Sequence, residues 1–242
     1  MKRRLILLRH GETQYSIERR MQGQLDIELT ENGKEQARKV APVIAAQKPF
    51  AIYSSDSSRA AVTARAVGEL AGVEVQLDKR LRETDMGEWA GLPHTEVEEG
   101  WPGQRLKWRA TPTYAPPGGE NRIELAERVA ELVRELIPKH PEWGEDDRPL
   151  LLVSHGGTIC ALAAALLDFP LQNYALLSAI GNTAWAQLTE WPAYVTDAEL
   201  DADPLTAGPR HRAVDPIHPG YQWRLDIWNN TAHLSEEPIV WR

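Results

Sequence analysis

The sequence predicts an α/β protein in which a mostly parallel central sheet lies between two layers of helices. Apolar segments of strand length alternate with longer segments of helical periodicity, as in parallel sheets whose strands are connected by helices. Polar residues that can do chemistry follow directly after several of the apolar segments. At 242 residues the chain is long enough for one large core, and we expect residues 1–242 to form a single domain.

The expected strands are short apolar runs, most of them bounded by polar or turn-forming residues. Residues 5–8 read Leu-Ile-Leu-Leu, and residues 150–153 read Leu-Leu-Leu-Val, the continuous apolar pattern of strands buried on both faces. In chain order the predicted strands are residues 4–8, 50–53, 73–77, 150–153, 184–188 and 223–228.

The expected helices lie between these strands. Thr30 is a suitable N-cap for a helix that runs to about residue 46, and a second helix is predicted over residues 57–71. Residues 123–137 are amphipathic, and a further helix begins at Gly157. The inward positions of the helices after Thr30 and over 123–137 are expected to be Ala37, Val40, Ala41, Ile44, Leu125, Val129, Leu132, Val133 and Leu136.

Two segments lack periodicity and are expected to be irregular. Residues 100–120 are rich in Pro and Gly and contain Trp101 and Trp108, and we interpret them as a lid over a functional site. Residues 191–220 are rich in Pro, Asp and Ala, and we interpret them as an insertion.

Composition argues against several classes of partner. The net charge of −8 disfavours nucleic acid. The single cysteine, Cys160, cannot form an internal disulfide, which is typical of a reducing compartment. The apolar runs are too short for a secretory signal or a membrane span. We therefore expect a cytoplasmic protein with no membrane partner.

The strongest chemical motif is Arg9-His10-Gly11, at the end of the first expected strand. Gly11 lets the chain turn sharply, so that His10 and Arg9 emerge together at the strand end. An imidazole can be a nucleophile, and a guanidinium can hold an anion with two hydrogen bonds. This pair suits attack on a phosphate.

Three further patches also lie where an expected strand ends and a loop or helix begins. They are residues 54–59, 81–84 and 154–157. Since ligands of open α/β sheets bind at the carboxyl ends of the strands, we expect the patches to meet in space. Arg59 is then a phosphate ligand at a helix start rather than a surface arginine. His155 is a donor to phosphate rather than a core histidine, with Gly156 allowing close approach of the backbone.

A carboxylic acid is needed to protonate a leaving group, and residues 81–89 offer Glu83, Asp85 and Glu88. The apolar neighbours of Glu83 predict a partly apolar pocket wall, which would raise the pKa of its carboxyl. The sequence also lacks the HExxH, Walker A, CxxC and GxSxG motifs, so metal, nucleotide and serine-hydrolase chemistry have no support. Cys160 is interpreted as a small core residue.

In order and spacing, the four patches resemble the histidine phosphatase superfamily, the phosphoglycerate mutase-like enzymes. The resemblance extends to about residue 188. It implies a three-layer α/β/α sandwich and a metal-independent phosphomonoester hydrolase that acts without a cofactor through a phosphohistidine. Other segments resemble the glucosyl-3-phosphoglycerate phosphatases of actinobacteria, which implies a small-molecule phosphomonoester substrate and a homodimer. These segments are residues 20–26, 81–84, 117–120, 141–144, 181–182 and 223–229.

The resemblance also implies roles for individual residues. His10 would be the nucleophile and Glu83 the proton donor. The phosphoryl oxygens would be held by Arg9, Arg59 and His155, with Gln22 lining the same pocket. The family often has Asn six residues after the signature His, and this chain has Ser16 there. The shorter serine hydroxyl would reach phosphate only through a water molecule.

Three alternative functions and the role of three aromatic residues remain open at this point. A phosphoglycerate mutase uses the same nucleophile but excludes water, although the short, modestly basic segment 101–117 favours hydrolysis. A broad acid phosphatase would have no dedicated sugar substrate. An inactive phosphate-binding module is disfavoured because His10 and His155 are both present. Finally, Trp101, Trp108 and Tyr114 either stack on a sugar ring or pack the lid onto the core.

Overall fold

The central feature of the computed structural model, which describes residues 2–192, 217–218 and 220–235, is one six-stranded sheet. Its strand order is β3-β2-β4-β1-β5-β6. The first four strands are mutually parallel, whereas β5 is antiparallel to both β1 and β6. The strands are β1 (Arg4–Arg9), β2 (Ala51–Ser54), β3 (Val75–Leu77), β4 (Leu150–Ser154), β5 (Trp185–Pro192) and β6 (Tyr221–Asn230).

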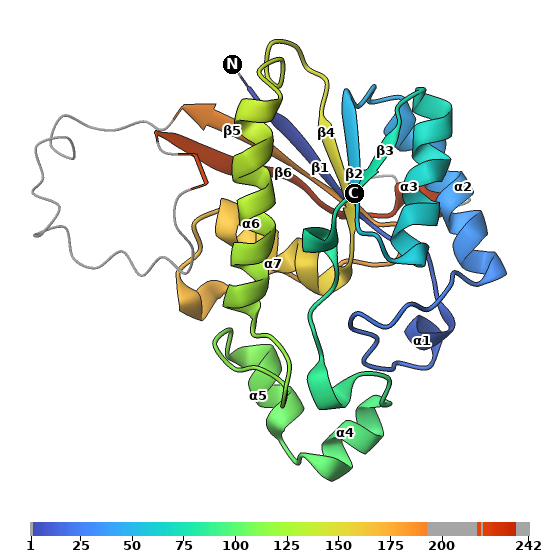
Figure 1. Cartoon of the computed structure of the whole chain (residues 1–242), viewed down its shortest axis with the longest axis vertical. Coiled ribbons are helices and arrows are strands. Elements are labelled where there is room, and N and C mark those ends of the chain that lie inside the picture. The colour runs from blue at the N-terminus through green and yellow to red at the C-terminus, as the bar shows by residue number, and fades with distance from the viewer. Residues whose placement is uncertain (1, 193–216, 219, 236–242) are drawn as a thin grey trace, which may run out of the picture.

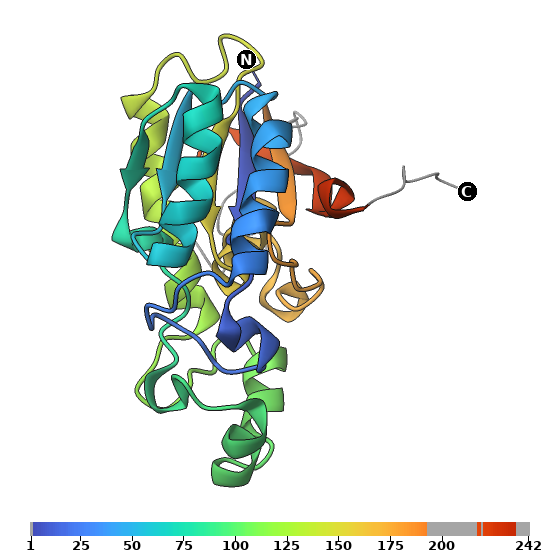
Figure 2. The ribbon, with the colours of Figure 1, turned by 90° about the vertical axis from the view of Figure 1, so that its right-hand side faces the viewer.

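Helices cover both faces of the sheet, which confirms the predicted α/β architecture. In Figures 1 and 2, α2 and α3 lie on one face and α6 and α7 lie on the other, while α1, α4 and α5 lie beyond one end of the strands. The helices are α1 (Gln14–Ile17), α2 (Glu31–Ala45), α3 (Ser58–Ala71), α4 (His94–Gly100), α5 (Gln104–Ala110), α6 (Arg122–Lys139) and α7 (Gly156–Leu166). Short 3-10 turns are η1 (Lys79–Leu81), η2 (Gly87–Trp89), η3 (Leu171–Asn173) and η4 (Ala232–Leu234).

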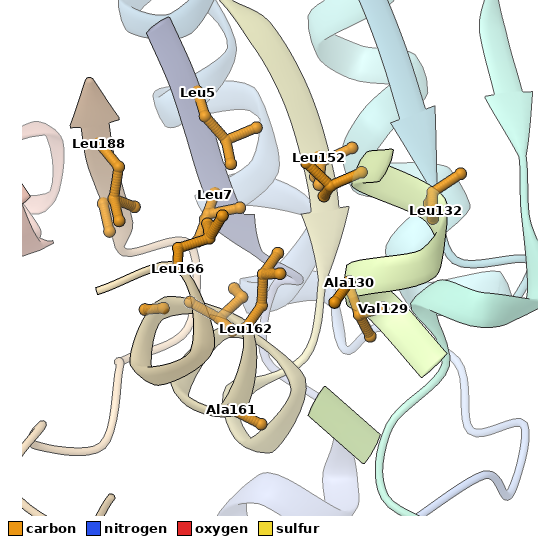
Figure 3. Close-up of a cluster of buried hydrophobic side chains, with 14 of the residues drawn as sticks. Leu5, Leu7, Val129, Ala130, Leu132, Leu152, Ala161, Leu162, Leu166 and Leu188 are labelled. Carbon is orange, nitrogen blue, oxygen red and sulfur yellow. The ribbon is translucent and has the colours of Figure 1, made fainter. Parts of the chain in front are cut away.

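Successive side chains of β1 point to opposite faces of the sheet, so the core has two layers. Leu5 and Leu7 belong to the cluster that includes α6 and α7, whereas Ile6 and Leu8 belong to the cluster under α2 and α3. Figure 3 shows Leu5 and Leu7 beside Leu152 of β4, facing α7. Because successive strand side chains point to opposite faces, a strand covered on both sides must be apolar throughout, as β1 is.

The predicted helix starts agree with the observed caps. The Thr30 hydroxyl accepts a hydrogen bond from the Gly33 amide at 2.9 Å and begins α2. At the start of α6, the Asn121 side chain accepts from the amides of Ile123 and Glu124, and the Glu124 carboxylate accepts from the Asn121 amide. Such capping boxes satisfy amides that have no partner within the helix. Every predicted inward residue of these two helices is buried.

The segment 100–120, predicted to be irregular, contains the helix α5 and the last residue of α4. The prediction failed because each helix is only seven residues long, too short for an apolar stripe to establish periodicity. The strand expected over 73–77 begins at Val75, after Gly72 ends α3 in a left-handed conformation. The insertion predicted over 191–220 lies mostly outside the described residues, although β5 extends through Trp191 and Pro192.

Candidate active site

A pocket of about 430 Å³ is lined by residues at the carboxyl ends of β1 and β4 and from the loops around them. All eight residues predicted for the site contribute to its lining: Arg9, His10, Ser16, Gln22, Arg59, Glu83, His155 and Gly156. The four sequence patches therefore meet in space, as the topology of an open α/β sheet requires.

His10 follows β1 directly, and its side chain is almost fully buried. Its Nδ1 lies 2.7 Å from the carbonyl oxygen of Gly11. A carbonyl can only accept, so Nδ1 carries the proton and Nε2 carries the lone pair. Burial, then the charges of Arg9 and Arg59, hold the pKa of His10 well below its ordinary 6.5. The neutral ring thus has a free electron pair on Nε2.

Arg9 and His155 line the same pocket as this imidazole. Nη1 of Arg9 donates to the Ile180 carbonyl at 2.7 Å, whereas its Nε is buried with no partner among the described residues. The His155 ring lies 5.1 Å from the His10 ring, centroid to centroid. Nε2 of His155 is 2.9 Å from the Ser55 hydroxyl, while its buried Nδ1 has no partner in the described part of the chain. Buried polar atoms normally have partners, so these two nitrogens are available to a ligand.

Arg59 lies in the first turn of α3, where a buried cation opposes the helix dipole. Its guanidinium is held by carbonyls, with Nη1 donating to Leu25 at 2.7 Å and Nη2 to Gly23 at 2.8 Å. The Gln22 amide oxygen accepts from Nε of Arg59 at 2.8 Å when the amide is oriented to satisfy both groups. Burial lowers the pKa of Arg59 to about 10, so the guanidinium remains charged at neutral pH.

Glu83 docks at the start of α7 rather than against the apolar wall that the sequence predicted. One carboxylate oxygen accepts from the Gly157 amide at 2.9 Å, and the other from the amides of Thr84 at 2.8 Å and Thr158 at 3.1 Å. A β-carbon on Gly157 would lie 2.5 Å from this carboxylate, so the contact requires glycine. Asp85 and Glu88 are exposed and do not line the pocket, which separates Glu83 from the other two candidates.

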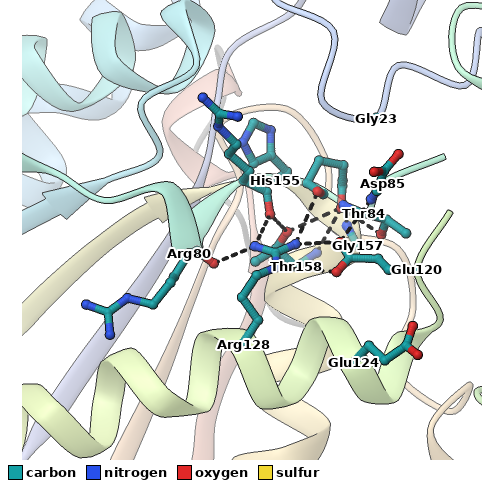
Figure 4. Close-up of polar contacts among 12 residues, drawn as sticks. Gly23, Arg80, Thr84, Asp85, Glu120, Glu124, Arg128, His155, Gly157 and Thr158 are labelled. Carbon is teal, nitrogen blue, oxygen red and sulfur yellow. Dashed lines mark hydrogen bonds and ion pairs between the residues drawn. The ribbon is translucent and has the colours of Figure 1, made fainter. Parts of the chain in front are cut away.

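Arg128 on α6 holds the loop that carries Glu83. Its Nη1 donates to the carbonyls of Arg80 at 2.7 Å and Arg82 at 3.1 Å, and its Nη2 donates to the carbonyl of Glu83 at 3.3 Å. Figure 4 shows this side chain reaching from α6 to the loop beside Thr158. Sequence reasoning missed Arg128 because it occupies an ordinary polar position of an amphipathic helix.

Ser16 and Gly156 line the pocket in different ways. The Ser16 hydroxyl is 3.0 Å from the Thr13 hydroxyl in the capping box of α1, so it is engaged by its own helix. Gly156 lies against Arg9, since a β-carbon there would be 3.5 Å from the Arg9 Nε. Cys160, which the sequence placed in the core, is instead half-buried in the pocket lining. Burial raises the pKa of its thiol to about 11, consistent with a thiol that stays protonated.

The outer wall of the pocket is basic, which sequence reasoning also missed. We define this outer wall as Arg20, His94, Arg105, Arg109 and Arg122. The Arg122 guanidinium lies 5.2 Å from the ring of Trp108, and the buried Nε of Arg105 has no partner within the described residues. Trp101, Trp108 and Tyr114 pack on the buried cluster around Trp89, and of these three only Trp108 also lines the pocket.

Among the described residues, no helix is long and apolar enough to cross a membrane, and no group of three or more His, Cys, Asp or Glu side chains is arranged to hold a metal ion.

The fold and this arrangement of two histidines and two arginines define a class of protein. Residues 5–195 match the histidine phosphatase superfamily (branch 1), to which the chain therefore belongs. The glucosyl-3-phosphoglycerate phosphatase of Mycobacterium tuberculosis is 44% identical over 240 residues, covering 98% of this chain and 99% of that protein. A solved mycobacterial glucosyl-3-phosphoglycerate phosphatase complexed with VO3 is 44% identical with a TM-score of 0.81, covering 95% of this chain and 100% of its own.

A more distant relative covers less of the sequence. A protein of Salmonella paratyphi C, described as a probable phosphoglycerate mutase, is 39% identical over 167 residues, which are 68% of this chain and 74% of that protein. The two relatives named as phosphatases thus match a region that extends well beyond the match to the mutase.

Proposed function

We propose that this chain hydrolyses glucosyl-3-phosphoglycerate, releasing phosphate and the glucosylated glycerate, through a phosphohistidine on His10. The observation that carries the proposal is the hydrogen bond from His10 Nδ1 to the Gly11 carbonyl, because it leaves the lone pair on Nε2. The likeness over nearly the whole chain to phosphatases named for this substrate supports its identity.

The proposed first step is an in-line attack of His10 Nε2 on phosphorus. The nitrogen–phosphorus bond forms as the bond from phosphorus to the glycerate oxygen breaks. Glu83 in its protonated form gives its proton to the departing oxygen, then accepts one from the water that hydrolyses the phosphohistidine. Its position at the start of α7, in the same pocket lining as His10, supports this role.

The transferred phosphoryl group carries negative charge that must be neutralised. Arg9 and Arg59 provide two buried cations. Among the described residues Arg9 Nε is a hydrogen-bond donor with no protein acceptor to displace, and His155 Nδ1 is likewise without a protein partner. Preorganised donors of this kind stabilise developing charge without reorganisation. We assign these residues, with Gln22 positioning Arg59, to the phosphate site.

The outer wall is proposed to bind the carboxylate of the glycerate moiety. Arg105 has a free buried Nε, and Arg122 is oriented by its stacking on Trp108. We expect Arg105→Ala to raise KM for glucosyl-3-phosphoglycerate about tenfold, since one charge-assisted hydrogen bond is lost, with little change for p-nitrophenyl phosphate. Arg65→Ala is the matched control, because Arg65 is exposed on α3 and is not in the pocket lining.

The decisive assay compares phosphate release from glucosyl-3-phosphoglycerate, mannosyl-3-phosphoglycerate, 3-phosphoglycerate and simple sugar phosphates. The proposal expects the highest kcat/KM for the glucosylated substrate, and His10→Ala should abolish nearly all turnover. A flat profile would instead identify a broad acid phosphatase. Conversion of 3-phosphoglycerate to its 2-isomer without release of phosphate would identify the mutase activity suggested by the Salmonella relative.

Assembly as a homodimer and a cytoplasmic location belong to the same proposal. Both rest on the resemblance and composition of the sequence rather than on the site. Analytical ultracentrifugation measures the oligomeric state, and a monomer would contradict the homodimer. Cell fractionation measures the location, and recovery in the membrane pellet would contradict a cytoplasmic protein. Neither result would bear on the proposed reaction.

A further inference from the structure

The carbonyl that orients His10 belongs to the peptide unit between Gly11 and Glu12. A β-carbon on Gly11 would lie 2.4 Å from the carbonyl oxygen of Gly33 in α2, so the close approach of α2 requires glycine here. Glycine has the greatest backbone freedom of any residue. The peptide unit that selects the His10 tautomer is therefore attached to the residue least able to fix its orientation.

Two side-chain amides hold this peptide unit by its two polar atoms. Asn182 Nδ2 donates to the Gly11 carbonyl oxygen at 3.1 Å and to the His10 carbonyl oxygen at 3.2 Å. Gln36 Oε1 accepts from the Glu12 amide at 2.9 Å. Asn182 comes from the loop before β5 and Gln36 from α2, so the peptide unit is bound from two separate elements.

The orientation of both amides follows from their neighbours. Asn182 faces two carbonyl oxygens, which only accept, so its nitrogen must point to them. Gln36 faces an amide hydrogen, so its oxygen must point there. The loop of Asn182 is itself anchored, since the Thr183 amide donates to the His10 carbonyl at 3.2 Å and the Gly181 amide donates to Asn229 Oδ1 at 2.8 Å.

We propose that Asn182 and Gln36 are positioning residues, which hold the Gly11 carbonyl where it accepts from His10 Nδ1 and keeps Nε2 as the nucleophile. Neither residue is in the pocket lining, so neither is expected to contact substrate. This inference deepens the proposed function and rests on His10 being the nucleophile. It predicts losses in kcat rather than in KM, because binding groups stay in place while the attacking atom is misoriented.

The two amides make opposite predictions for isosteric substitution. Asn182→Asp keeps the shape but replaces the donor by oxygen facing two carbonyl oxygens, and we expect kcat to fall about 10- to 100-fold, as for other residues that orient a histidine. Gln36→Glu keeps the acceptor for the Glu12 amide and should change kcat by about twofold or less, whereas Gln36→Ala should lower it about tenfold. A packing role would predict that both isosteric variants are tolerated.

The experiment measures kcat and KM of these variants with p-nitrophenyl phosphate, together with inhibition by vanadate. Asn32→Ala is the control, an exposed asparagine on α2 that should behave as the unmodified protein. A ¹⁵N-histidine NMR spectrum, with the His10 signals assigned from their absence in His10→Ala, should show a larger fraction of Nε2-protonated ring in Asn182→Asp. Unchanged vanadate affinity would show that each variant retains a folded pocket.

Wild-type kcat in both Asn182→Asp and Gln36→Ala, or a loss confined to KM, would overturn the inference. An unchanged His10 tautomer in Asn182→Asp would also overturn it. If the unmodified protein hydrolyses no phosphomonoester, the proposed function fails, and the NMR spectrum still decides whether the two amides control the His10 ring.

Discussion

At the scale of single residues, the chemistry of the site depends on which nitrogen or oxygen carries a proton. In the proposed mechanism His10 must be neutral to attack, and burial together with the charges of Arg9 and Arg59 holds its pKa well below 6.5. In the same mechanism Glu83 must deliver a proton, yet it is bound by the amides at the start of α7. One pocket must therefore hold a histidine without its extra proton and a glutamate with one, and each requirement leads to a prediction that can be measured.

The depressed pKa of His10 predicts that kcat/KM does not decline near pH 6.5 but falls only at lower pH, where the ring finally protonates. The groups that face it are Arg9 on β1, Arg59 on α3 and His155 after β4. Arg59→Met removes one of these cations, so it should raise the His10 pKa and move the acid limb up by about one pH unit. Titration of the His10 ¹⁵N signals measures the same shift, and an unmoved limb would contradict it.

Glu83→Gln should separate substrates by their leaving groups. The amide cannot donate a proton as an acid, so turnover of a sugar phosphate should fall by about 100-fold or more. p-Nitrophenolate leaves without protonation, and turnover of p-nitrophenyl phosphate should fall far less. Single-turnover rates with both substrates make the comparison, and equal losses would remove Glu83 as the acid.

The sequence identified residues whose side-chain type and position at a strand end indicate a chemical role. It missed residues that hold backbone groups of the site in place. Arg9, His10 and His155 were visible because they follow apolar strands. Arg128 was not, and Asn182 entered only through the resemblance of segment 181–182 with no role given to it, because their hydrogen bonds to carbonyls of distant loops leave no local pattern. The environment of Glu83 was predicted wrongly for the same reason: two of its three amide partners come from α7, about 75 residues further along, and the third is the adjacent Thr84.

At the scale of elements, the start of α7 fixes the position of the acid. Helix starts present amides without intrahelical partners, and Glu83 occupies those of Gly157 and Thr158. The sequence predicted this helix and the strand before it. The helices that the sequence did not predict are the short ones, α1, α4 and α5. At α4 and α5, packing of Trp101 and Trp108 on Trp89 stabilises helices too short to show periodicity.

Gly157→Ala tests the role of that helix start. The added methyl would lie 2.5 Å from the Glu83 carboxylate and 3.0 Å from the Thr84 hydroxyl, so the flexible carboxylate must move away while the helix remains. We expect Gly157→Ala to lower the turnover of sugar phosphates about tenfold and that of p-nitrophenyl phosphate far less, as for Glu83→Gln. Gly100→Ala is the control, since a β-carbon there meets nothing within 4 Å. Equal losses on all substrates would show a general disturbance instead.

At the scale of the whole molecule, the buried histidines link stability to pH. Burial holds the pKa values of His10 and His155 well below 6.5 in the folded state, whereas the unfolded chain binds protons normally. The unfolded state therefore binds more protons below pH 6.5, and the free energy of unfolding falls with decreasing pH until the folded pKa is reached. Each histidine lowers the free energy of unfolding by at most about 1.4 kcal/mol for each pH unit between 6.5 and its folded pKa.

Urea denaturation at pH 7.5 and pH 5 measures this loss. In His10→Gln the change in unfolding free energy between the two pH values should be smaller than in the unmodified protein, because one of the two buried histidines is gone. Carboxylates contribute equally to both proteins and cancel in the comparison. The same pH dependence in the variant and the unmodified protein would show that His10 ionises freely in the folded state.

The pocket joins parts of the chain that are remote in sequence: the bond from Arg9 to the Ile180 carbonyl spans 171 positions. No partly folded chain can offer such a site, so an anion that binds there binds the native state alone. By mass action the protein is then stabilised by about 2.7 kcal/mol when the free ligand reaches a hundred times its dissociation constant. If the pocket binds phosphate as proposed, ambient phosphate therefore stabilises the folded chain as well as occupying its site.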